Sequence, residues 1–300
     1  MNLSTEPVAL AGATGDLGGR IARELLRLGV PLRVLARPSS DNGALEALEV
    51  AGAEVYIQSF DDQSALTEAC NGVHCVVSAL SGLEDVIVDT QLRLLAAARA
   101  AGVRRFVPSD FSIDFTTLPR GTNRNLDLRR KFHDQAAGGE TQLTSVLNGM
   151  FADLLTGEAP FIIDPLHRVI YYGNARQPMD FTTMDDTARY TARVAADADP
   201  TPRYLRIAGD VLDTYGLAEA AGKARAGQYR PLRVGGLGLL SRIIDVTHLL
   251  APGKGDTYPA WQGMQYMRNM FSGAAKLSPL DNDRYPDMTW TPVAEVLRGA

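Results

Sequence analysis

The sequence predicts an α/β fold, in which a doubly wound parallel sheet is followed by a smaller C-terminal α+β lobe. Up to about residue 155, short apolar runs alternate with segments of helical periodicity, the pattern of parallel strands joined by crossover helices. The chain has 300 residues and is 45% hydrophobic, which allows a sizeable core. Beyond residue 155, Pro, Gly and Tyr become frequent and the apolar runs shorten, which indicates a second lobe.

Six strands are expected in the first part of the chain, each a short apolar run between turn residues. The expected strands are 8–11, 32–36, 54–57, 75–78, 105–108 and 143–147. Helices are expected at 17–28 and 85–101, where apolar residues recur at helical spacing. Right-handed crossovers then make the sheet doubly wound.

The second part is expected to be a smaller lobe of short strands and helices. Its expected elements are strands 161–163 and 169–172 and helices 185–196 and 215–225. We therefore predict a first domain over 1–155 and the smaller lobe over 156–300, with parts of 174–210 returning to the first domain.

The first predicted strand leads into a glycine-rich loop and a helix, in VALAGATGDLGGRIARELLRLG. Gly12 permits a tight turn, Gly15 lets backbone N–H groups approach a pyrophosphate, and Gly18 lets the helix pack against the strand. The strand before the glycines and the helix after them are the context of a Rossmann-type dinucleotide site. Other contacts expected from this loop are Thr14, Asp16 and Leu17.

The second strand ends in Arg37, where NAD-binding chains commonly have an acidic residue. A carboxylate would repel a 2′-phosphate, whereas a guanidinium binds it through two parallel N–H bonds. Arg37 therefore favours NADP(H), with Ser39 and Ser40 as further donors. The alternative is a solvated surface arginine, since arginine is the usual cation of this chain.

Ligands of open α/β sheets bind beyond the carboxyl ends of the strands. The remaining expected cofactor contacts are Ala79, Leu80, Ser81, Ser109, Asp110, Phe111, Asn148, Gly149 and Phe151. Asp110 also has the chemistry of a cleft acid. Equally, Ser109 and Asp110 have the chemistry of a cap on the next segment.

Several segments together resemble the NmrA-like branch of the atypical short-chain dehydrogenases, close to the isoflavone reductase and phenylcoumaran benzylic ether reductase group. They are GATGDLGGRIARELL, LARPSS, DQSALTEACNGVHCVVSAL, QLRLLAAARAAGVRRFVPSDF, TSVLNGMFADLL and FTTMDDTARYTARV. The resemblance covers most of residues 8 to 195. It implies a Rossmann domain with a smaller substrate lobe, use of NADPH, and hydride transfer to a small aromatic or conjugated substrate. Some NmrA-like members instead bind the dinucleotide as regulators, so a non-catalytic redox sensor is the alternative function.

The same resemblance implies a catalytic lysine on the helix after the fifth strand. Tyrosine is nowhere followed by lysine four residues later, so the usual Tyr-x-x-x-Lys pair is missing. In DLRRKFHD, the family lysine falls on Lys131 in one alignment and on Arg129 in another. Lys131 is our candidate acid or base. Arg129, the alternative, could orient a ligand but not give up its proton.

The two candidates lie on opposite edges of the apolar stripe formed by Leu128, Phe132 and Ala136. Only one edge is expected to face the cleft. A third reading gives the helix no catalytic role, because Asp127 precedes Lys131 by four residues and favours a helix ion pair.

The partner that the resemblance implies is a small-molecule substrate. The net charge of −5 argues against nucleic acid and anionic membranes, and the sequence has no apolar run long enough to span a bilayer. We expect a cytoplasmic protein and a possible homodimer.

No metal site is expected. Cys70 and Cys75 are expected to be reduced and buried. His133 and His167 are expected to be structural. Trp261, Met264, Met267 and Phe271 share one helical face, which suits lobe core, a subunit contact or a substrate wall.

Overall fold

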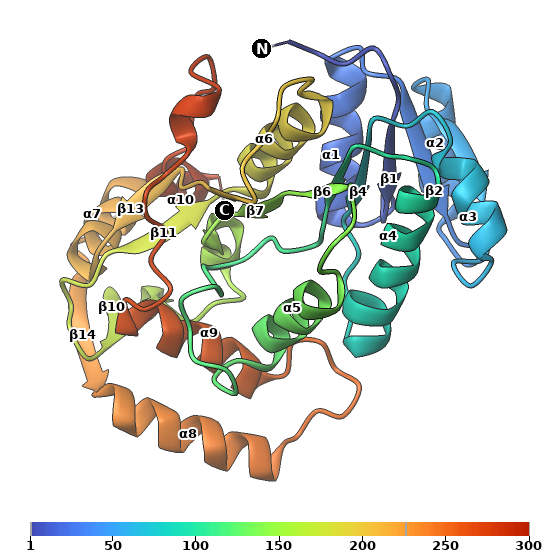
Figure 1. Ribbon diagram of the computed structural model, residues 1–300. Helices are drawn as coiled ribbons and strands as arrows, with labels where there is room; N and C mark the ends of the chain where they lie inside the picture. Colours follow the sequence, from blue (N-terminus) through green and yellow to red (C-terminus); the bar gives the residue numbers. More distant parts are fainter. Residues whose placement is uncertain (1, 226, 300) are drawn as a thin grey trace. The chain divides into compact units, whose positions relative to one another are not determined.

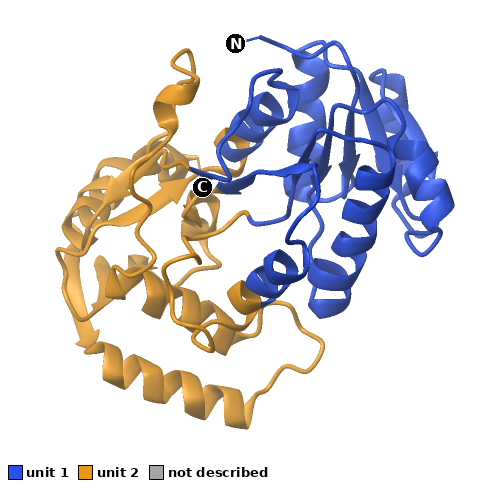
Figure 2. Ribbon diagram, viewed as in Figure 1, with its two compact units in different colours: residues 1–110, 128–146, 187–205 blue, residues 111–127, 147–186, 206–300 orange. Residues whose placement is uncertain are grey.

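The computed structural model describes residues 2–225 and 227–299. The chain divides into two compact units (Figure 2): unit 1 extends to Asp110 and includes Leu128–Val146 and Thr187–Leu205, and unit 2 consists of Phe111–Asp127, Leu147–Asp186 and the chain from Arg206 onward. Four elements, α5, α6, β7 and β12, begin in one unit and end in the other.

Unit 1 is built on a six-stranded sheet of order β3-β2-β1-β4-β5-β6 (Figure 1). Every pairing in this sheet is parallel. The strands are β1 Val8–Ala11, β2 Leu32–Ala36, β3 Glu54–Ile57, β4 Cys75–Ser78, β5 Arg105–Val107 and β6 Gln142–Leu143. The helices of this part are α1 Asp16–Arg27, α2 Asn42–Val50, α3 Gln63–Cys70, α4 Gln91–Ala100, α5 Arg124–Gln135 and α6 Met184–Ala196. The predicted α/β fold class is confirmed.

The strand order reverses between β1 and β4, and this is where the ligand crevice of a doubly wound sheet opens. From β1 to β3 the chain adds each new strand on one side of β1, and after β3 it returns to add β4, β5 and β6 on the other side. Right-handed crossovers in these two directions place helices on both faces of the sheet. The face that carries α3, α4 and α5 is a continuous apolar core. In that core Phe106 of β5 stacks on Phe132 of α5 with ring centroids 6.2 Å apart, which fixes α5 against the sheet.

Two expected elements are divided. Expected strand 143–147 becomes β6 and β7 (Ser145–Leu147), because Thr144 N–H donates to Phe106 in the sheet, whereas Ser145 N–H donates to Arg203, just before β12 (Tyr204–Arg206). Expected helix 85–101 becomes a π-helical turn, η1 (Asp85–Thr90), followed by α4. Both divisions depend on bonding partners that periodicity does not report.

The described part of unit 2 contains two small sheets, four α-helices and short 3-10 turns. The sheets have orders β14-β10-β9 and β13-β11-β8. Their strands are β8 Met150–Phe151, β9 Ile162–Ile163, β10 Arg168–Tyr172, β11 Met179–Thr182, β13 Asp210–Leu212 and β14 Arg230–Gly235. The helices are α7 Thr214–Ala224, α8 Leu237–Leu250, α9 Ala260–Ser272 and α10 Val293–Arg298, with short 3-10 turns η2 Ala152–Thr156, η3 Asp164–Leu166 and η4 Asn282–Arg284.

The predicted helical face of α9 is core of unit 2. Trp261, Met267 and Phe271 are buried, and Met264 is half-buried. Phe271 contacts the rings of Phe161 and Tyr172 at centroid distances of 5.5 and 6.2 Å. Of the three uses suggested by the sequence, the contacts within unit 2 therefore support lobe core.

Candidate functional site

The turn between β1 and α1 needs glycine at two positions for reasons internal to the protein. Gly12 has φ +89°, and a Cβ there would lie 2.6 Å from the carbonyl oxygen of Ala79. A Cβ on Gly18 would lie 2.0 Å from the carbonyl oxygen of Gly12. Both contacts are impossible for a side chain, so these glycines let α1 and the end of β4 close tightly around the loop.

Gly15 is different, because no contact with the residues that the structure describes requires it to be glycine. It has φ −83° as the N-cap of α1, and a Cβ there would approach nothing closer than the Gly12 oxygen at 3.4 Å. No side chain within residues 2–225 and 227–299 caps this end of α1, and Asp16 is ion-paired with Arg20 at 2.7 Å. The exposed space above the first helical N–H groups suits a pyrophosphate, so the loop fits a dinucleotide.

Arg37 projects from the end of β2 and is exposed. Its backbone forms a tight turn with Ser40, whose hydroxyl accepts from the Arg37 N–H at 3.0 Å and whose N–H donates to the Arg37 carbonyl at 2.9 Å. Among the described residues, none hydrogen bonds to the Arg37 guanidinium. Ser40 thus shapes the turn, and Ser39 is exposed beside it.

The carboxyl ends of β4 and β5 are tied together by Ser109. Its hydroxyl donates to the carbonyl of Leu80 at 2.7 Å, and its N–H donates to the side chain of Gln91 at 2.8 Å. Leu80, Ser109 and Asp110 are buried, Ala79 is half-buried and Ser81 is exposed. The sequence reading missed Gln91, a fully buried amide at the start of α4, whose polar character inside an apolar helix was the available signal.

Asp110 is completely buried and belongs to a polar network with α5. Its Oδ2 accepts from His133 Nε2 at 2.6 Å and from the Ser145 hydroxyl at 2.7 Å. Burial acts to raise the pKa of Asp110, but the interactions with His133 and Ser145 and the charge of Arg129 outweigh it and hold that pKa below its ordinary value. His133, which is expected to be structural, thus has a carboxylate partner from another segment of the chain.

The two basic candidates on α5 have different surroundings. Arg129 is buried at 6% exposure and lies one helical turn before His133, so it is on the face of α5 that meets Asp110. Lys131 has a 45% exposed side chain that forms an ion pair with Glu84, whose hydrogen bond and charge raise the Lys131 pKa. Asp127, the expected partner of Lys131, accepts from the N–H of Gly121 at 2.8 Å.

The last expected cofactor contacts, Phe111, Asn148, Gly149 and Phe151, belong to unit 2. Asn148 is fully buried, and its side-chain amide has no hydrogen-bond partner among the described residues. Gly149 has φ +69° and packs on Asp180, because a Cβ there would lie 2.4 Å from the Asp180 oxygen. An orphaned buried amide is costly, so Asn148 is the residue of this group that most needs a partner.

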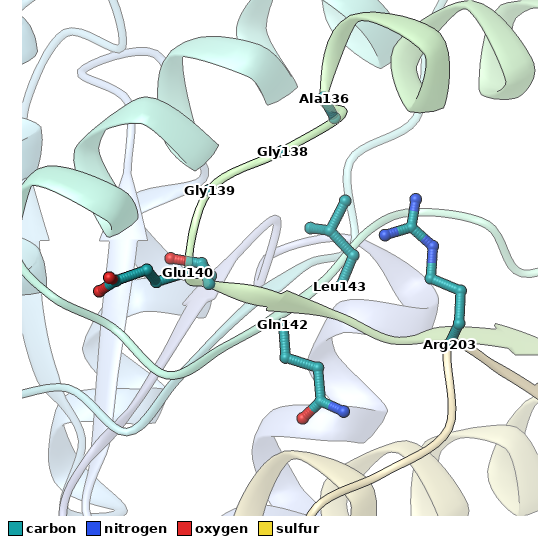
Figure 3. A pocket seen from close by; sticks show the side chains of 8 residues that line it. Ala136, Gly138, Gly139, Glu140, Gln142, Leu143 and Arg203 are labelled. Atoms are coloured by element: carbon teal, nitrogen blue, oxygen red, sulfur yellow. The ribbon is translucent and has the colours of Figure 1, made fainter.

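A hollow of about 290 Å³ lies elsewhere in unit 1 (Figure 3). Its lining is Ala136, Gly138, Gly139, Glu140, Thr141, Gln142, Leu143 and Arg203. All of these residues except Arg203, which precedes β12, precede or form β6, and none is an expected cofactor contact. The hollow is therefore not assigned to the dinucleotide.

The described residues lack two features that other classes of function require. Residues 2–225 and 227–299 contain no group of three or more His, Cys, Asp or Glu side chains arranged to hold a metal ion. No helix among them is long and apolar enough to cross a membrane. Burial raises the pKa of Cys70 to about 11 and that of Cys75 to about 12, and both are free thiols.

Comparison with known proteins gives one family. Residues 4–120 match the model of the NmrA-like family. Bifunctional pinoresinol-lariciresinol reductase 1 of Thuja plicata is 31% identical over 216 residues, 67% of this chain and 68% of the relative. Phenylcoumaran benzylic ether reductase PT1 of Pinus taeda is 25% identical over 223 residues, 70% of this chain and 71% of the relative. The structure of AtPrR2 with NADP+ and (+)pinoresinol has a TM-score of 0.81 at 24% identity and covers 98% of both chains.

Proposed function

This chain belongs to the NmrA-like family, alongside pinoresinol-lariciresinol and phenylcoumaran benzylic ether reductases, and we propose that it is an NADP(H)-dependent reductase of a small aromatic or conjugated molecule. The observation that carries the proposal is the loop between β1 and α1. Gly12 and Gly18 are required by the protein, whereas Gly15 keeps open a space that the protein itself does not need. A pyrophosphate at the helix N-terminus accounts for that space.

NADPH, when bound, supplies a hydride to the substrate. The chain would hold its pyrophosphate with the loop from Gly12 to Gly18 and its 2′-phosphate with Arg37. The ends of β4 and β5, from Ala79 to Ser81 and at Ser109 and Asp110, would line the rest of the dinucleotide. Phe111, Asn148, Gly149 and Phe151 remain proposed contacts from unit 2.

Within this proposal Arg129 is the α5 side chain of the site. Its burial and its position one turn from His133 support this assignment. Arginine keeps its proton at neutral pH, so Arg129 would donate hydrogen bonds to a substrate oxygen on which negative charge develops. The proton that neutralises this oxygen would then come from water. Conjugated carbonyl compounds are acceptors of this kind.

Lys131 remains the alternative acid or base. Its ammonium forms an ion pair with Glu84 on the exposed side of α5. To act on a substrate, the side chain would have to leave that carboxylate. This requirement is why the geometry favours Arg129.

The proposal is tested by incubating the purified chain with NADPH and a panel of aryl enones, quinones and benzylic ethers. We expect substrate-dependent oxidation of NADPH, followed at 340 nm, and a reduced product with at least one class. Tight binding of NADPH without any turnover across the panel would instead support a redox-sensing regulator. A cytoplasmic location and a homodimer also remain predictions, and light scattering tests the second.

A further inference from the structure

Helix α8 of unit 2 is apolar on two opposite sides (Figure 1). Leu240 and Ile244 are buried, and the ring of His248 lies on Trp261 of α9 with ring centroids 4.1 Å apart, so these residues mark the side of α8 that packs on α9. The other side is exposed and still apolar, with Leu239, Val246, Leu249 and Leu250 exposed by 46%, 54%, 80% and 77%. A helix on the surface of a monomer normally carries polar residues on its outer side.

The exposed apolar residues of α8 form one stripe. At about 100° per residue, the four side chains fall within an arc of about 100° around the helix axis. Exposed apolar residues also precede the helix, at Leu232 and Val234 of the edge strand β14, which leads into α8. A continuous exposed apolar surface of this kind marks an interaction site on a soluble protein.

Arg242 and Asp245 are the two acidic or basic residues of α8, and both are on the exposed side. On the helix Arg242 lies within the apolar stripe, between Val246 and Leu249, and Asp245 lies at its edge. Neither side chain forms an ion pair or a hydrogen bond with another residue in the described part of the chain. The stripe therefore carries one charge of each sign that the folded chain itself does not use.

The two charges are complementary to their own copies under two-fold symmetry. When two α8 helices pack antiparallel about a two-fold axis, residues at equal distances on either side of the axis lie opposite each other. An axis midway between positions 243 and 244 places Arg242 of each copy opposite Asp245 of the other, which gives two equivalent ion pairs. The same register brings Leu239 of each copy next to Leu249 of the other, so one arrangement satisfies the charges and covers the apolar stripe.

We propose that the exposed side of α8, formed by Leu239, Arg242, Asp245, Val246 and Leu249, binds a second copy of this chain in this antiparallel arrangement. The balanced charges favour a second copy over an anionic membrane surface, which attracts helices rich in Lys and Arg. The surface lies wholly in unit 2 and takes part in no step of the proposed reaction. The inference thus goes beyond the proposed function, and either can fail without the other.

Light scattering of the purified full chain over a concentration series tests the surface. We expect the wild type at twice the mass of one chain, and a dissociation constant that Leu249→Glu raises by about tenfold or more, because the new carboxylate would be buried without a partner. Val50→Glu is the matched control, since Val50 is 91% exposed at the end of α2 and should leave the dimer intact. Circular dichroism verifies that both variants keep their helices.

Exchange of the two charges tests the register. Arg242→Glu and Asp245→Arg each place like charges opposite each other at both pairs, so each variant alone should dissociate about tenfold or more readily. An equimolar mixture of the two variants should associate within about threefold of the wild type, because each new charge then meets an opposite charge on the other variant. A wild type that stays monomeric, a dimer that Leu249→Glu leaves intact, or a mixture that associates no better than its components would overturn the proposal.

Discussion

Gly12, Gly15 and Gly18 stand in one loop for two different reasons. Gly12 and Gly18 must be glycine because a Cβ at either position would collide with backbone atoms of the protein. A Cβ at Gly15 would meet no such obstacle, so the reason for glycine there is the space that it leaves for a ligand. A sequence shows three equivalent letters, and only the distances separate their roles. The same holds for His133, whose carboxylate partner lies 23 positions away in the chain and on another element.

The two kinds of glycine should respond differently to alanine. In Gly18→Ala the new Cβ would meet the Gly12 oxygen at 2.0 Å, so we expect a stability loss of about 3 kcal/mol or failure to fold. In Gly15→Ala the nearest atom is 3.4 Å away, so the fold should remain and NADPH affinity should fall about tenfold or more. Thermal unfolding and titration calorimetry check the pair. Equal losses of stability in both variants would contradict it.

Arg37 is expected to select the cofactor. Removal of its guanidinium in Arg37→Ala should weaken NADPH binding by about two orders of magnitude and NADH binding by less than about threefold. Dissociation constants from fluorescence titration measure both. The exposed Arg27, in the last turn of α1, is a matched control in Arg27→Ala. If Arg37→Ala weakens NADPH and NADH equally, the 2′-phosphate assignment is wrong.

Asp110 should make the protein sensitive to acid. Its pKa is below the ordinary value in the folded chain, so its stabilising effect is complete above an ordinary pKa of about 3.9 and is lost as pH falls through the folded value. Asp110→Asn should be less stable by about 3 kcal/mol at pH 7, and the difference should shrink toward pH 3. Urea unfolding at several pH values measures this. A difference that is independent of pH would show that Asp110 is not the ionised partner.

Elements were predictable from the sequence where local pattern decides them. The bounds of β1 to β4 agree with the expected strands, because each is an apolar run closed by turn residues. The sixth strand was not, since Thr144 and Ser145 bond in opposite directions to distant residues, Phe106 and Arg203. The π-turn before α4 was likewise hidden, because it is held by the Thr90 hydroxyl, which donates to the Asp85 carbonyl, and by the Gln91 side-chain amide, which donates to the Ile87 carbonyl.

The periodicity of the sequence did not decide which edge of helix α5 is buried. Its apolar stripe has Arg129 on one edge and Lys131 on the other, and the contacts of His133 and Glu84 show which edge is buried. We expect Arg129→Leu to lower kcat by about a hundredfold and Lys131→Ala to change it by less than about threefold. Steady-state kinetics on the same substrate compare them. The reverse order would restore Lys131 as the acid or base.

For the whole molecule, the fold class and the cofactor type followed from the first forty residues and the alternation of strands and helices. The polar network under Arg129 did not, because Asp110, His133, Ser145 and Arg203 come from four segments that only the folded chain of unit 1 brings together. Family membership is consistent with the glycine loop and with Arg37.

Transfer of deuterium from the nicotinamide tests the central claim most directly. NADPH labelled with deuterium at carbon 4, on one face or the other, is incubated with the chain and an active member of the panel, and the product is analysed by mass spectrometry. We expect one deuterium in the product from one of the two labelled forms and none from the other. Bound NADPH that transfers no deuterium to any compound from either form would contradict a reductase and identify a protein that only binds the dinucleotide.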